Sequence, residues 1–76
     1  MIFGKRITAT YSVEGMMCGK CASRVENALL RVQGVKKVTA DFQTGNVLVV
    51  SVRALEENEV KTVIEGLGYA FKGIVK

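Results

Sequence analysis

The chain has 76 residues, and we treat residues 1–76 as a single small domain. Hydrophobic residues make up 49% and charged residues 24%, which is typical of a globular protein. The chain is too short for a large enzyme with a deep substrate cavity. The net charge of +4 is spread along the chain without Trp or aromatic interleaving, so no nucleic-acid surface is indicated. The charge indicates either an ordinary solvated surface, which we favour, or a field that steers the domain toward an acidic protein partner.

The first half of the chain predicts a strand, a loop and a helix. Residues 5–13 alternate between apolar and polar side chains, which indicates a half-buried strand. The glycine-containing stretch 14–19 is expected to be a loop. Over residues 20–33 the apolar period becomes helical, and Gly34 is the expected end of this helix. The apolar face of that helix comprises Cys21, Val25, Ala28, Leu29 and Val32.

The second half predicts a hairpin, a helix and a last strand. We expect a two-residue turn at Thr44 and Gly45, which pairs Phe42 with Val47 and Ala40 with Val49 on one sheet face. A helix is expected over about 55–67, with acidic residues in its first turns and an apolar stripe. That stripe comprises Val60, Val63, Ile64 and Leu67. Residues 69–75 form the last expected strand.

The resulting order, βαββαβ, predicts a fold of the α+β class. With right-handed crossovers it is the ferredoxin-like plait: a four-stranded antiparallel sheet with both helices on one face. The opposite face is then open, and it carries the apolar stripe Leu48, Val50 and Val52 beside Thr8, Thr10 and Ser12. This stripe either marks self-association or docking, or reflects the strand propensity of β-branched residues.

Two cysteines separated by two residues are the chemically distinctive feature. Cys18 is expected on an exposed loop and Cys21 in the first helical turn. Free helix N–H groups and the neighbouring Lys20 favour thiolate over thiol, so we expect both thiol pKa values to be lowered. Two adjacent thiolates suit a soft monovalent ion, Cu(I) above all, because Cu(I) needs few ligands. We therefore expect a metal carrier without catalytic residues.

Other uses of C-x-x-C fit this chain less well. A structural zinc site needs four protein ligands, whereas the chain has two Cys and no His. A structural disulfide is disfavoured by the cytoplasmic setting that we expect, since no secretory signal or membrane span is evident. The main alternative is a thiol–disulfide oxidoreductase, because C-G-K-C is close to thioredoxin-type motifs. Thioredoxin-like folds place a cis-proline beside their cysteines, and this chain has no proline.

The segment from Gly15 to Cys21, together with Gly34-Val35 and Gly68-Tyr69, resembles the heavy-metal-associated (HMA) domain. The resemblance runs from about residue 8 to 71. It implies the same plait, and it implies that Cu(I), and in some members Zn(II), Cd(II) or Hg(II), is bound by the two thiolates and passed between partners. That family includes copper chaperones and N-terminal modules of metal-transporting P-type ATPases. We expect a copper chaperone here, with an ATPase module as the alternative.

The resemblance also implies roles for individual residues. Cys18 and Cys21 match the metal ligands. Met16 matches a methionine that packs under the metal loop, and Tyr69 matches a position at which a side chain shields the metal, with core packing as the alternative for both.

Met17 departs from the family pattern, which usually has Thr, Ser, His or Asp at this position. With no carboxylate between Gly15 and Cys21, the loop favours Cu(I) or Ag(I). Met17 itself is expected either to contact a partner as an exposed apolar residue, which we favour, or to add a weak thioether contact. The expected partner is a metal-transporting P-type ATPase or another thiolate carrier. A weak homodimer, held by the metal or by the open sheet face, is a further expectation.

Overall fold

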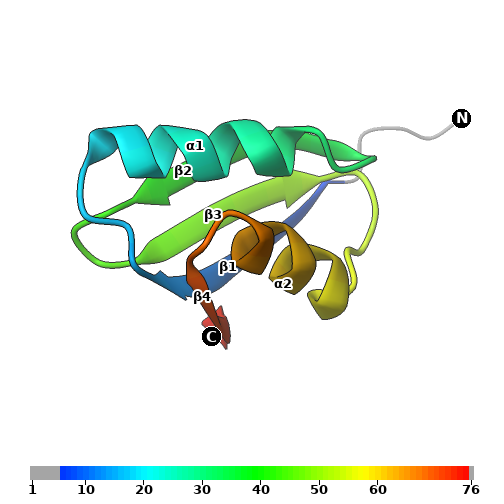
Figure 1. Cartoon of the computed structure of the whole chain (residues 1–76). Helices are drawn as coiled ribbons and strands as arrows, with labels where there is room; N and C mark the ends of the chain where they lie inside the picture. The colour runs from blue at the N-terminus through cyan, green and yellow to red at the C-terminus, as the bar shows by residue number, and fades with distance from the viewer. Residues whose placement is uncertain (1–5, 76) are drawn as a thin grey trace, which may run out of the picture.

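The computed structural model describes residues 6–75, and its elements follow the predicted order. Strand β1 (Ile7–Glu14) leads into helix α1 (Gly19–Leu30), followed by β2 (Val35–Asp41), β3 (Asn46–Ser51), helix α2 (Glu57–Gly66) and β4 (Ala70–Val75). The strands form one antiparallel sheet in the order β2-β3-β1-β4. Both helices lie on the same side of this sheet (Figure 1). The expected ferredoxin-like plait is confirmed.

The core lies between the sheet and the two helices. From the sheet, alternate residues of each strand point toward the helices, as a period of two requires. From the helices, one apolar stripe points back, and its members Val25, Leu29, Val60 and Ile64 have no exposed surface. Burial of each such side chain stabilises the fold by about 1.5–3 kcal/mol. Tyr11 and Phe71 contact each other at the β4 side, with ring centroids 5.9 Å apart.

The register predicted for the β2–β3 hairpin was wrong by two residues. Asp41 pairs with Asn46, and Ala40 pairs with Val47, so the loop has four residues instead of two. A two-residue turn at Thr44 and Gly45 would require positive φ at Thr44, and among the described residues only glycines have positive φ. Instead, the backbone carbonyl of Asp41 accepts a hydrogen bond from the Gly45 N–H at 2.8 Å.

Face assignments survive this error because a shift of two residues preserves the side on which each side chain lies. Val38, Val47 and Val49 face the core as expected. Phe42 is the exception, since it lies in the loop with 39% of its surface exposed. On the open face, Leu48 lies opposite Thr10 and is exposed, as the sequence predicts.

The helices are shorter than the periodicity predicts. α1 ends at Leu30, and the following residues close with 3₁₀-type bonds, such as the N–H of Val32 to the carbonyl of Leu29 at 3.0 Å. α2 begins at Glu57, with Glu57 and Glu59 in its first turn. Acidic side chains at this end interact favourably with the helix dipole and stabilise the helix. Among residues 6–75, no helix has the length and apolar character that a membrane span requires.

Candidate metal-binding site

The two cysteines lie where the loop after β1 becomes helix α1. Cys18 is the N-cap residue, with extended backbone (φ −159°, ψ 175°), and its carbonyl accepts the first helical hydrogen bond from Ala22 at 3.1 Å. The Cys18 side chain makes no capping bond to the helix, and its sulfur lies beside that of Cys21. Cys18 is placed just before the helix, and Cys21 lies in the first turn of α1, so the two side chains converge.

The two sulfurs form an open pair at the protein surface. The Sγ atoms of Cys18 and Cys21 are 4.0 Å apart, and both cysteines are free of disulfide bonds. Cys18 is exposed, whereas Cys21 is half-buried and packs against the hydrophobic core. One thiol is therefore accessible to an incoming molecule and the other is anchored.

The pKa of the Cys21 thiol is lowered from 9.0 to about 7. The largest cause is the hydrogen bond that the Tyr69 hydroxyl donates to the Cys21 sulfur, followed by the backbone N–H of Met17 and, with a smaller effect, the groups of Cys18; partial burial opposes them. The direction expected from the sequence is confirmed for Cys21. The expected cause was incomplete, because Lys20 is not among the leading contributions.

Tyr69 reaches Cys21 from the far end of the chain. It follows α2 and directly precedes β4, and its ring packs against the core. The hydrogen bond to Cys21 raises the pKa of the Tyr69 hydroxyl, which stays protonated as a donor. Gly15 lets the ring approach: a Cβ on Gly15 would lie 3.1 Å from Cδ1 of Tyr69, and its φ of +108° disfavours other residues. Sequence reasoning missed this role of Gly15.

The two methionines of the loop have opposite environments. Met16 is 6% exposed and belongs to the hydrophobic core. Met17 is 83% exposed. Among residues 6–75, no three His, Cys, Asp or Glu side chains gather into a group that could hold a metal ion. The two thiolates are therefore not accompanied by the carboxylates that divalent ions favour.

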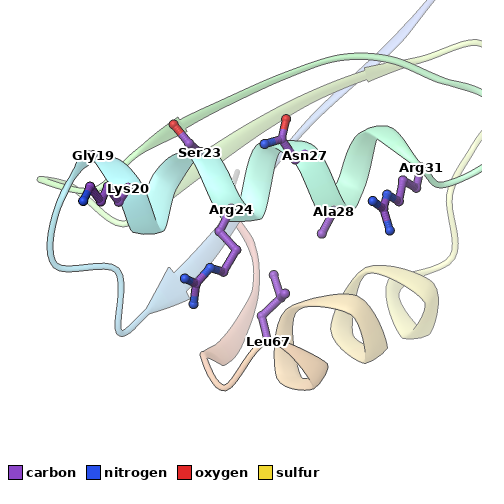
Figure 2. Close-up of a pocket in the computed structure, with 8 residues that line it drawn as sticks. All are labelled: Gly19, Lys20, Ser23, Arg24, Asn27, Ala28, Arg31 and Leu67. Atoms are coloured by element: carbon purple, nitrogen blue, oxygen red, sulfur yellow. The ribbon is translucent and has the colours of Figure 1, made fainter.

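A basic groove runs along α1 from the cysteines. It has a volume of about 520 Å³ and is lined by residues of α1, by Arg31, which follows α1, and by Leu67, which follows α2. Figure 2 shows Arg24 and Leu67 extending into the space between the two helices. Lys20, Arg24 and Arg31 give this surface a positive charge. Lys20 thus lies at the edge of the site as part of a charged surface.

Comparisons with known proteins agree with this architecture. The family model of the heavy-metal-associated domain matches residues 10–70. The copper chaperone CopZ of Enterococcus hirae is 37% identical over 60 residues, covering 78% of this chain and 87% of that protein. A copper-exporting P-type ATPase of Bacillus subtilis is 31% identical over 65 residues, covering 84% of this chain. The chain spans only 8% of the length of that ATPase.

Solved structures show the same fold. A structure described as a CopZ metallochaperone superposes with a TM-score of 0.81 at 33% identity, covering 87% of this chain and all of that one. The apo N-terminal domain of ZntA gives a TM-score of 0.82 at 26% identity, covering 95% of this chain and 96% of that one. The chain belongs to the heavy-metal-associated domain family.

Proposed function

We propose that this protein binds Cu(I) through the thiolates of Cys18 and Cys21 and transfers it to the thiolates of a partner. The observation that carries this proposal is the surface pair of free sulfurs, 4.0 Å apart, with one exposed and one anchored. The family and the names of its relatives support a soft metal as the cargo. Residues 1–76 act in this proposal as one carrier domain, located in the cytoplasm.

The separation of the sulfurs suits a single soft ion. With a metal–thiolate distance of about 2.3 Å, an ion touching both sulfurs has an S–metal–S angle of about 120°. That angle fits a three-coordinate ion with one position open to another ligand. A linear two-coordinate ion needs the sulfurs about 4.6 Å apart, which is a small movement for the exposed Cys18.

Charge favours a monovalent ion. With its pKa near 7, Cys21 is about half ionised at neutral pH before any metal arrives. Two thiolates and Cu(I) together carry one negative charge, which the start of α1 and the basic side chains of its groove stabilise. Like Cu(I), Ag(I) and Hg(II) are soft ions that prefer sulfur ligands. Zn(II) and Cd(II) are weaker candidates because the site lacks further ligands of its own.

Transfer proceeds by ligand exchange, without oxidation or reduction. A partner thiolate forms a bond to the ion at its open side, the bond to exposed Cys18 breaks, and a second partner thiolate then replaces Cys21. The Tyr69 hydroxyl stabilises Cys21 as a thiolate when its bond to the metal breaks. We propose a metal-transporting P-type ATPase, or another thiolate carrier with an acidic surface, as the partner.

Two contexts share this site. The chain functions either as a free copper chaperone, like the relative of which it covers 87%, or as an N-terminal module of a P-type ATPase, like the relative of which it covers 8%. The size of the native protein on a denaturing gel distinguishes them. The redox alternative predicts reduction of insulin disulfides with thioredoxin reductase, whereas the proposed carrier is inactive in that assay.

The direct test is an anaerobic competition titration of Cu(I) against a chromophoric chelator. The reduced wild-type protein should bind one equivalent, and Cys18→Ser or Cys21→Ser should remove tight binding. Ser23→Ala is the matched control, because it changes an exposed side chain two residues after Cys21 that is not a proposed ligand. This variant should bind Cu(I) as the wild type does. Stoichiometric tight binding by the double cysteine variant would refute the proposal.

A further inference from the structure

An ion held between Cys18 and Cys21 has one open side, and what fills that side rests on the proposed function. The sulfur pair, 4.0 Å apart, gives an ion two donors and an angle of about 120°, so a third donor can enter in the same plane. Within residues 6–75, no cluster of His, Cys, Asp or Glu supplies that donor. The remaining soft atoms near the pair are the thioether sulfurs of the loop.

The two loop methionines differ in their freedom to move. Met16 is 6% exposed and packed in the core, so its sulfur could reach the ion only by leaving a cavity behind. Met17 is 83% exposed, so its side chain can turn without losing packing. Methionine has three rotatable side-chain bonds, which lets the sulfur search a wide space around its Cα.

The backbone brings Met17 close to the anchored cysteine. Met17 directly precedes the ligand Cys18 in the chain, and its backbone N–H is one of the groups that lower the pKa of Cys21. The Met17 side chain therefore starts one residue before an exposed ligand whose sulfur lies 4.0 Å from the other. The side chains of other neighbours offer no soft atom, because Gly19 has none and Lys20 ends in an ammonium group.

We infer that the thioether of Met17 is a third, exchangeable ligand of the bound Cu(I) or Ag(I), beside the thiolates of Cys18 and Cys21. A thioether is neutral and soft, so it leaves the charge of the site at minus one and favours monovalent ions over Zn(II). On transfer, the incoming thiolate bonds to the ion as the Met17 sulfur–metal bond breaks. The labile ligand thus holds the position that a partner must enter.

The effect on affinity is moderate because the bound side chain loses rotamer freedom that it has in the free protein. We expect Met17→Leu to weaken Cu(I) binding about tenfold, and Zn(II) binding by less than about twofold. Leucine matches methionine in size and apolar character and differs in having no sulfur, so a loss caused by packing or by the fold would appear with both ions.

The experiment follows the methionine methyl carbons by NMR. The protein is labelled with ¹³C at the methionine ε-methyl groups, reduced, and titrated with one equivalent of Ag(I), which is diamagnetic and soft. The Met17 resonance, assigned by its absence in Met17→Leu, should shift on binding, while the buried Met16 resonance should move little. The Cys18→Ser/Cys21→Ser double variant with the same Ag(I) measures adventitious thioether binding, and its Met17 resonance should stay near the metal-free position.

The outcomes separate this inference from the proposed function. If the wild type binds one equivalent but the Met17 methyl does not shift beyond the double variant, the inference is wrong and the carrier function stands. Cu(I) affinity within twofold of the wild type in Met17→Leu also overturns the inference. If the wild type fails to bind one equivalent at all, the proposed function fails and the inference with it.

Discussion

Removing the hydroxyl of Tyr69 should raise the pKa of Cys21. This hydroxyl makes the largest contribution to lowering that pKa from 9.0 to about 7, ahead of the Met17 backbone and the Cys18 groups. In Tyr69→Phe the latter groups remain, so the pKa should move part of the way back toward its ordinary value.

The size of the effect follows from the two limits. At pH 7 a thiol with a pKa of about 7 is half ionised, whereas one at 9.0 is about one hundredth ionised, so complete loss of the shift would reduce the thiolate fraction about fiftyfold. Because Tyr69 is the largest of several contributions, we expect a decrease of roughly three- to tenfold.

The assay is the ¹³Cβ chemical shift of the cysteines against pH in the reduced, metal-free protein, which reports each thiol separately. Alkylation rates are a poorer measure, because a thiolate of higher pKa is also the stronger nucleophile and partly offsets its lower population. Tyr11→Phe is the matched control, since it removes a hydroxyl from a tyrosine buried in the core. An unchanged Cys21 midpoint in Tyr69→Phe, or an equal shift in the control, would refute the reasoning.

Three further predictions test the packing, the pH linkage and the open sheet face. Gly15→Ala should cost about 1–3 kcal/mol in urea unfolding, because of its positive φ and the nearby Tyr69 ring. Gly19→Ala, with open space around it, should be neutral or stabilising by up to about 1 kcal/mol; equal losses in the two variants would contradict the packing argument. Folding lowers the pKa of Cys21, so the thiolate's contribution to stability is complete above pH 9.0 and is lost as the pH falls through about 7. Between pH 7 and pH 9 the midpoint of urea unfolding should therefore rise more in the wild type than in Cys21→Ser. Leu48 is exposed on the open face, and if that face self-associates, Leu48→Lys should abolish concentration-dependent growth in sedimentation; a wild type that stays monomeric at high concentration excludes self-association.

Sequence patterns were sufficient for the architecture because each element carries its own period. Alternation in β1 and the helical stripe through Val25 and Leu29 are local signals, and burial of both on one side of the sheet follows from them. The β2–β3 register was not recoverable in the same way. It depends on which loop backbone is least strained, and the four-residue loop that closes on Asp41 avoids a positive φ at Thr44.

The site was predictable in its ligands and less so in its electrostatics. Two cysteines at a loop-to-helix junction are visible in the sequence. The hydroxyl that most strongly lowers the pKa of Cys21 comes from Tyr69, which the plait brings back from the other end of the chain. Only the resemblance to a family pointed to that residue beforehand. Gly15, which admits the Tyr69 ring, gave no signal beyond being a glycine in a loop.

X-ray absorption of the Cu(I)-loaded, reduced protein tests the central claim most directly, because it identifies the atoms bonded to the metal. The account predicts a first shell of sulfur alone, with two thiolates from Cys18 and Cys21 and no nitrogen or oxygen neighbour. A first shell made of nitrogen or oxygen would contradict it.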